Sequence, residues 1–327
     1  MVSGPEGIAV AAEALRSGRL VALPTETVYG LAADATDPEA VAAIFRVKGR
    51  PTDHPLIVHI ADATELDRWA SSVSPEARAL ADAFWPGPLT LLLTRSEAVG
   101  DWVTGGRDTV GLRVPGHPVA LALLEAFGGA VAAPSANRFG KVSPTTAAHV
   151  VADLGGDVEV VLDGGACTVG VESTIVDCSG DEVLVLRQGG VSVEALRAVL
   201  GFGPRIETAS ASPGEARAPG MLAAHYAPSA QVIICASDQV VAEAMVLSAE
   251  DDPGVVIGVL APGVVEGLPV GVIELEPAGD AERYASVLYD RLRQADRLGI
   301  THLLCVPPPA VGVGAAVLDR LQRASVR

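Results

Sequence analysis

The sequence predicts an α/β protein of two domains. Hydrophobic residues make up 49% of the chain and aromatic residues only 4%, a composition typical of sheets and helices packed by Val, Ala, Leu and Ile. Short apolar runs alternate along the chain with helical patterns, as α/β folds require. With 327 residues, the chain is long enough for two domains that each bury a core.

Charge and cysteine content disfavour several classes of protein. The formal net charge is −17, which repels a phosphate backbone, so a broad nucleic-acid-binding surface requires locally concentrated cations. The four cysteines show no CxxC spacing, so we expect buried reduced thiols and neither disulfides nor a metal site. The sequence shows no basic leader and no apolar run of about 18 residues, and we expect a cytoplasmic protein.

Residues 20–60 are the predicted centre of the active site. Residues 20–23 form an apolar run typical of a buried strand, which Pro24 ends. Four polar side chains follow at the carboxyl end of this strand, where open α/β sheets bind their ligands: Thr25, Glu26, Thr27 and Tyr29. We expect Gly30 to let the chain turn sharply there.

A helix opens at Asp37-Pro38, an N-cap followed by a first-turn proline, and ends near Lys48-Gly49-Arg50. A Lys and an Arg on a glycine-containing loop suit a polyphosphate. A solvated basic helix end is the alternative. The chain has only two lysines, Lys48 and Lys141, both in predicted polar loops, which favours a specific role.

His54 comes just before the next predicted strand, 55–60, and His59 and Arg113 lie within predicted strands. A lone His in the strand 55–60 is more often a core residue than a ligand, but two His residues directly after Lys48 and Arg50 suggest donors to one ligand. After a helix at 74–84 and the turn WPGPLT, strands are expected at 89–94 and 109–115. Arg113 in the latter strand should face a carboxylate, either the protein's own or, as we favour, a ligand's.

Polar turns recur after later strands. Ser135, Asn137 and Ser143 offer donors that suit phosphate or ribose, although a turn before a helix at 145–154 explains them about as well. Strands are expected at 158–163 and 183–186, and in the stretch 170–177 adjacent hydroxyls enter another apolar strand; these segments bring Ser173 and Arg187. One shared pocket explains so many polar strand ends better than independent surface features.

Residues 204–229 change character and are the predicted linker between a domain at 1–203 and a domain at 230–327. The linker carries His225 and Tyr226, and such a pair on a mobile tether could close over a site. Strand and helix patterns alternate from residue 231 onward, which predicts a small parallel α/β domain with a regulatory or supporting role.

Eight ordered motifs resemble the YrdC family in its long, two-domain form, the threonylcarbamoyl-AMP synthases. They are PTETVYGL, KGRPTDHPLIVHI, WPGPLT, VGLRVPGHP, APSANRFGKVSPT, GVESTIVD, RQGG and APGMLAAHYAP. The resemblance covers nearly the whole chain. It implies a twisted mixed sheet with a central ligand cleft and a smaller Rossmann-like parallel domain at the C-terminus.

The resemblance also implies an activity. The family is a group of nucleotidyltransferases that convert L-threonine, bicarbonate or CO2, and ATP into L-threonylcarbamoyl-AMP and diphosphate, for threonylcarbamoylation of an adenosine in tRNA. Mg²⁺ would accompany ATP and would have no dedicated protein site. The expected partners are the enzymes that transfer the product to tRNA, with a possible weak tRNA contact and no membrane.

The site residues implied by the resemblance fall into two groups. L-threonine would contact Thr27, His59, Arg113, Ala133 through its backbone, and Ser173. ATP would contact Lys48, Arg50, His54, Thr109, Ser135, Asn137, Ser143, Arg187 and Tyr226, with Lys48 and Arg50 as catalytic cations. Ala223 and Ala224 depart from the basic or aromatic residues that many relatives carry before the His-Tyr pair.

Two alternatives stay open. One is an RNA-binding or tRNA-binding module of the same fold, which the acidic balance disfavours. The other is a carbamoyl-phosphate-handling domain of the hydrogenase-maturation type, which would need neighbouring zinc-finger and acylphosphatase-like segments.

Overall fold

The computed structural model describes residues 1–207, 219, 226–249, 252 and 254–326. Contacts divide the chain into two compact units. Unit 1 comprises Met1–Phe139 and Ser143–Leu222, and unit 2 comprises Gly140–Val142 and Ala223–Arg327. Most of the predicted linker at 204–229 lies outside the described residues, so the predicted domain boundaries stay predictions.

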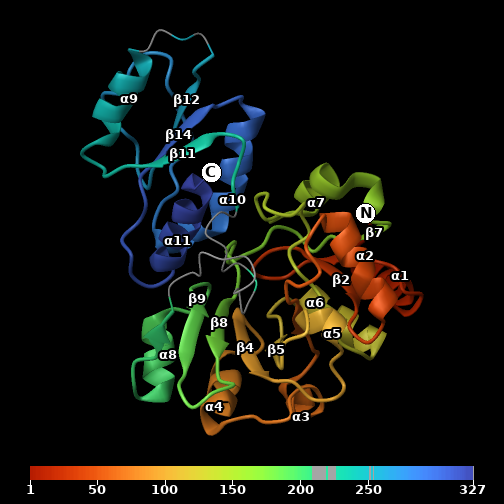
Figure 1. Ribbon diagram of the computed structural model, residues 1–327. Coiled ribbons are helices and arrows are strands. Elements are labelled where there is room, and N and C mark those ends of the chain that lie inside the picture. The colour runs from red at the N-terminus through yellow and green to blue at the C-terminus, as the bar shows by residue number, and fades with distance from the viewer. Residues whose placement is uncertain (208–218, 220–225, 250–251, 253, 327) are drawn as a thin grey trace. The chain divides into compact units, whose positions relative to one another are not determined.

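Unit 1 contains a mixed sheet of ten described strands in the order β10-β9-β8-β4-β5-β3-β6-β2-β1-β7. Its strands β9, β8, β4 and β5 lie side by side in Figure 1. Parallel pairs such as β3 with β5 lie beside antiparallel pairs such as β4 with β5, so the predicted mixed sheet is confirmed. The strands are β1 (Val21–Leu23), β2 (Gly30–Asp34), β3 (Ile57–His59), β4 (Leu89–Thr94), β5 (Thr109–Arg113), β6 (Val131–Ala132), β7 (Val160–Val161), β8 (Thr174–Asp177), β9 (Leu184–Arg187) and β10 (Arg205–Ile206).

Five helices of unit 1 (α2, α4, α6, α7 and α8) begin at a residue whose side chain caps the first turn. The Asp37 side chain accepts hydrogen bonds from the backbone N–H groups of Glu39 and Ala40, and Gly49 ends the helix in the left-handed conformation. The helices are α1 (Gly4–Arg16), α2 (Pro38–Lys48), α3 (Leu66–Trp69), α4 (Pro75–Phe84), α5 (Asp101–Thr104), α6 (Pro118–Phe127), α7 (Ala147–Leu154) and α8 (Val193–Leu200), with 3₁₀ turns at Ala63–Glu65 and Gly155–Asp157.

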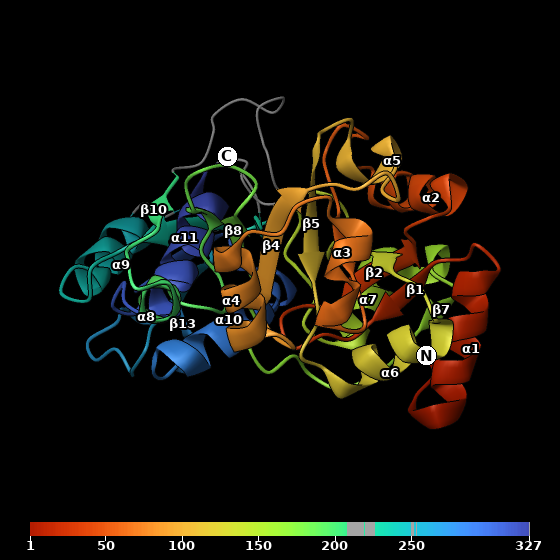
Figure 2. The same ribbon diagram turned by 90° about the horizontal axis from the view of Figure 1, so that it is seen from below.

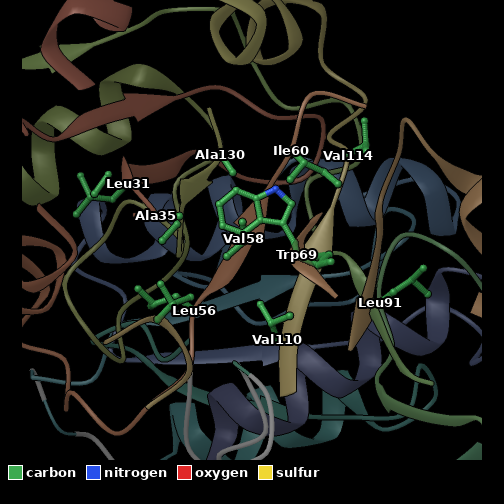
Figure 3. Close-up of a cluster of buried hydrophobic side chains, with 14 of the residues drawn as sticks. Leu31, Ala35, Leu56, Val58, Ile60, Trp69, Leu91, Val110, Val114 and Ala130 are labelled. Carbon is green, nitrogen blue, oxygen red and sulfur yellow. The ribbon is translucent and has the colours of Figure 1, made fainter. Parts of the chain in front are cut away.

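Two apolar layers hold this sheet. On one face, the indole of Trp69 packs among side chains of β3 and β5 and their flanks, including Val58, Ile60 and Val114 (Figure 3). On the other face, α1 lies beside α6 (Figure 2), and their alanines and leucines pack onto β1, β2 and β6. Burial on both faces explains the continuous apolar runs of the strands.

The predicted role of Gly30 is wrong. Gly30 begins β2 and pairs with Leu23 across an antiparallel ladder, so the chain has already turned when it reaches this residue. The turn is held by Thr25, whose hydroxyl accepts from the N–H groups of Thr27 and Val28 and donates to the Val28 carbonyl. The sequence also gave no expectation of β2, or of β10 inside the range 204–229.

Among its described residues, unit 2 contains four parallel strands in the order β11-β14-β12-β13. They are β11 (Gln231–Ile234), β12 (Ile257–Leu260), β13 (Ile273–Glu274) and β14 (His302–Cys305), and they lie between α9 (Val240–Ser248) and α10 (Ala281–Arg297) in Figure 1, with α11 (Gly314–Ser325) as the last helix. The predicted parallel α/β fold is confirmed.

All four cysteines are buried and free, which confirms the predicted buried thiols. Among the described helices, none is both long and apolar enough to cross a membrane.

Candidate functional site

A buried ion pair lies where β1 ends and β5 ends. The guanidinium of Arg113 donates from Nη2 to Glu26 Oε1 at 2.6 Å, from Nη1 to the Thr27 hydroxyl at 3.0 Å, and from Nε to the Gly87 carbonyl at 3.2 Å. The side chains of Arg113 and Glu26 are only 5% and 9% exposed. The carboxylate that Arg113 faces is therefore the protein's own, and not a ligand's as the sequence analysis favours. The role of Arg113 in binding threonine stays a prediction.

His59 lies beside this pair. β3 and β5 run parallel in a register that places His59 opposite Arg113. Burial, followed by the positive charge of Arg113, lowers the pKa of His59 to about 3. His59 is therefore a neutral imidazole near neutral pH, and its Nδ1 is buried without a hydrogen-bond partner in the part of the chain that the structure describes.

Ser173 and Arg187 form a second buried group at β8 and β9. Arg187 donates from Nε to the Ser173 carbonyl and from Nη2 to the Ser173 hydroxyl, both at 3.0 Å. Thr90 of β4 shares a hydrogen bond of 2.8 Å with the same hydroxyl. These bonds fix the Ser173 side chain at the start of β8, next to the turn whose Gly87 contacts Arg113.

Lys48 is buried, so two expectations for this residue are wrong: it lies neither at a solvated helix end nor in a polar loop. It is the last residue of α2, is 3% exposed, and donates from Nζ to the carbonyls of Ser135 and Asn137. Burial, and next the neighbouring Arg50, lower its pKa well below the usual value. The Asn137 amide oxygen also accepts from the Ser135 hydroxyl at 2.6 Å.

Arg50 and His54 meet around Phe139. Arg50 donates from Nη2 to the Pro55 carbonyl at 3.0 Å, and its guanidinium carbon lies 5.8 Å from the centre of the Phe139 ring. The His54 ring meets the same ring edge-on, with centroids 5.5 Å apart. Burial and the charge of Arg50 lower the pKa of His54. The structure thus brings Lys48, Arg50 and His54 into one region.

The remaining residues predicted to contact a substrate are spread over several parts of unit 1. Ser143 is buried and donates to Glu172 Oε1 at 2.7 Å. Ala133 donates its N–H to the Ile57 carbonyl, and Thr109 lies at the opposite end of β5 from Arg113, about 13 Å away at the usual rise of a strand. The threonine group and Thr109 are thus separated by the length of a strand.

Tyr226 belongs to unit 2. Its ring stacks on Tyr289 at 5.7 Å, and the guanidinium carbon of Arg320 lies 5.1 Å from its centre. His225 lies outside the described residues. A role for Tyr226 over a nucleotide stays a prediction.

Sequence reasoning placed Glu26 at the ligand-binding end of its strand but missed its pairing with Arg113, and it did not assign Glu172 or Thr90 to the site. Glu26 and Glu172 hold Arg113 and Ser143, and Thr90 holds Ser173. A signal existed, because Glu26 and Glu172 each precede a hydroxyl residue assigned to the site, and a buried carboxylate needs a donor. Which donor each one meets depends on strand order, which the sequence pattern does not give.

These features define a class of protein. The fold is a two-unit α/β protein whose mixed sheet gathers buried cations, hydroxyls and a neutral imidazole, a set suited to small anionic or zwitterionic ligands.

Comparisons with known proteins give the family. The Sua5/YciO/YrdC model, described as telomere recombination, matches residues 13–189, and the model described as threonylcarbamoyl-AMP synthase, C-terminal domain, matches residues 191–326. The chain therefore belongs to the Sua5/YciO/YrdC family, in its two-domain form.

Individual relatives match over nearly the full length. Proteins named threonylcarbamoyl-AMP synthase from Pyrococcus abyssi and Bacillus subtilis are 44% and 40% identical, each over 97% of this chain and over 94% and 92% of their own lengths. The crystal structure of P. abyssi Sua5 complexed with L-threonine is similar with a TM-score of 0.91 at 43% identity, covering 97% of this chain and 94% of that one.

Proposed function

We propose that this protein is an enzyme that makes L-threonylcarbamoyl-AMP and diphosphate from L-threonine, bicarbonate or CO2, and ATP. The observation that carries the proposal is the buried guanidinium of Arg113, surrounded by hydroxyl and carboxylate groups, in a chain similar over its full length to threonylcarbamoyl-AMP synthases. A buried guanidinium is a natural partner for the carboxylate of an amino acid.

Two of the three substrates, L-threonine and ATP, would each meet a separate group of residues. The threonine carboxylate would bind Arg113, with Thr27, His59, Ser173 and the Ala133 backbone around the rest of the amino acid. Lys48, Arg50 and His54 lie together and would face the phosphates of ATP, with Ser135, Asn137, Ser143, Thr109, Arg187 and Tyr226 as further contacts.

The chemistry then needs no protein nucleophile. The threonine ammonium nitrogen releases two protons to solvent water or bicarbonate and forms a bond to the carbon of CO2, which gives a carbamate. A carbamate oxygen attacks the α-phosphorus of ATP, and the bond from that phosphorus to the bridging oxygen of diphosphate breaks. Arg50 and Lys48 would stabilise the negative charge that develops on the phosphate oxygens, so positioning and electrostatics supply the catalysis.

Mg²⁺ fits this scheme as part of the ATP substrate. Among the described residues, no group of three or more His, Cys, Asp or Glu side chains could hold a metal ion, and the nearby carboxylates Glu26 and Glu172 already accept from Arg113 and Ser143. Magnesium commonly binds through substrate phosphates and water. The ion would neutralise phosphate charge, and no protein cage is needed.

The product would serve tRNA modification. We expect a downstream enzyme to take up threonylcarbamoyl-AMP and transfer the threonylcarbamoyl group to a tRNA adenosine, and we therefore place the protein in the cytoplasm. A direct contact with tRNA would be weak, since the formal net charge of −17 opposes it.

The first prediction concerns diphosphate release. With ATP, Mg²⁺ and bicarbonate, release should require L-threonine, and L-serine should support less of it, because loss of one methyl group changes binding by about 1 to 3 kcal/mol. Arg113→Ala should lower kcat/KM for threonine by about tenfold or more.

The matched control is Arg19→Ala, which removes an arginine that is 41% exposed and pairs with Glu159; its activity should match the unchanged protein. Threonine-independent release, or equal activity of the two variants, would contradict the proposal.

A further inference from the structure

We propose that Glu26 binds the α-ammonium group of the amino-acid substrate, so that Glu26 and Arg113 together recognise a zwitterion. The inference rests on the proposed function and adds a residue to it. Glu26 would determine that the substrate is an α-amino acid, where a site built on Arg113 alone would accept any small carboxylate.

The first observation is an unsatisfied oxygen. Glu26 is 7% exposed and uses Oε1 for Arg113, while its Oε2 is buried without a hydrogen-bond partner in the chain as described. A buried carboxylate oxygen without a donor is destabilising, and such groups in native proteins call for an explanation. A bound ammonium group would supply the missing donor.

The second observation is that Glu26 is firmly placed. Its carbonyl accepts from the Val169 N–H at 2.7 Å, and the residues on either side belong to the turn that Thr25 holds. Its carboxylate also lies against Gly116, where an added Cβ would come within 3.4 Å of Oε1. The carboxylate is therefore fixed beside Arg113 before any substrate arrives, which lowers the entropy lost on binding.

Charge complementarity gives the ligand class. Glu26 and Arg113 carry opposite charges at 2.6 Å and are shielded from water. A zwitterion adds one positive and one negative group and leaves the buried site neutral. A lone carboxylate or a lone amine would leave one charge unpaired, which is unfavourable in a buried site.

The competing explanation is that Glu26 only neutralises Arg113. The two roles predict different effects of Glu26→Gln, a change that keeps the shape and removes the charge. If Glu26 only positions Arg113, the two ligands with a carboxylate, threonine and 3-hydroxybutyrate, should weaken by the same factor, and 1-amino-2-propanol should be unaffected. If Glu26 binds the ammonium group, only ligands with an amine should weaken.

The experiment measures binding of three compounds by calorimetry to the full chain without ATP: L-threonine, 3-hydroxybutyrate, which lacks the amine, and 1-amino-2-propanol, which lacks the carboxylate. In Glu26→Gln, threonine and 1-amino-2-propanol should bind about tenfold or more weakly, while 3-hydroxybutyrate should bind at least as well as before, because Arg113 loses a competing carboxylate. Glu26→Asp, which keeps the charge, should restore part of the amine preference.

The control is Glu159→Gln, which removes a carboxylate that is 65% exposed and pairs with Arg19. This variant should leave all three affinities unchanged.

An equal loss for threonine and 3-hydroxybutyrate in Glu26→Gln would overturn the inference and leave the proposed function intact. Absence of threonine binding to the unchanged protein would overturn both. If Glu26→Gln does not fold, the comparison of Glu26→Asp with the unchanged protein decides, because a shorter carboxylate should weaken only the amine-bearing ligands.

Discussion

At the scale of single residues, buried ionisable side chains are held near polar partners from other elements. Lys48 meets two carbonyl groups, Arg113 meets a carboxylate and a hydroxyl, and Arg187 meets Ser173. Such partners offset the loss of hydration that burial imposes. The pairing explains how this unit keeps charges in its interior.

His59 gives a pH prediction. Its pKa is lowered from 6.5 to about 3 in the folded protein, so between these values the unfolded chain binds a proton that the folded chain does not. The free energy of unfolding should therefore fall as pH falls through this window, by up to about 1.4 kcal/mol per pH unit.

Replacing His59 by Gln removes this titrating group, so the free energy of unfolding of the variant should change less with pH inside the window. Denaturant unfolding of the variant and the unchanged protein, at several pH values inside the window, measures the difference. Parallel curves in the two proteins would show that His59 does not titrate on unfolding.

At the scale of elements, the site depends on how closely the ends of β8 and β9 approach each other. An added Cβ at Gly189 would lie 2.2 Å from the Glu172 carbonyl oxygen and 2.4 Å from the Ser173 carbonyl carbon. Since both neighbours are backbone atoms, only a shift of the strand ends could make room. Ser173 and Arg187 would move with them.

Gly189→Ala should therefore destabilise the protein by about 1 to 3 kcal/mol and raise KM for threonine. Gly180→Ala is the matched control, because it lies in the turn between β8 and β9 and a Cβ there meets nothing within 4 Å. Thermal unfolding and steady-state kinetics of both variants measure the effect. Equal behaviour of the two would show that the strand ends can separate freely.

At the scale of the whole molecule, the net charge and the burial of cations favour small anionic ligands over RNA. The chain has 23 Lys and Arg against 40 Asp and Glu, and cations of the predicted ATP group such as Lys48 and Arg50 are buried and not displayed on a surface. A small anion can reach such groups, whereas the backbone of a folded RNA needs an exposed basic face.

We therefore expect no saturable binding of tRNA at physiological salt. Fluorescence anisotropy of labelled tRNA, at low and at physiological salt, with ATP and threonine present or absent, measures it. Tight binding that weakens steeply with salt would instead favour the RNA-binding module.

Much of the fold follows from the sequence because its signals are local. Pro24 ends a buried strand, Asp37-Pro38 caps a helix, and apolar runs in unit 2 alternate with helical patterns, all as the structure has them. Each depends on residues within a few positions of one another, so the pattern can be interpreted without knowing the fold. The short strand β2 was not predicted because its residues, Gly, Leu, Ala, Ala and Asp, include no β-branched or aromatic side chain that would signal a strand.

The sequence by itself determined the residue types of the site and the strand ends that carry them. Only the tertiary structure decided their partners: Glu26 for Arg113, 87 residues away, Ser135 and Asn137 for Lys48, and the close approach at Gly189. The physical reason is that such pairs form across a sheet whose strand order is set by crossovers between distant segments. Local periodicity places a side chain on a face, and packing of the whole sheet then selects the group that it meets.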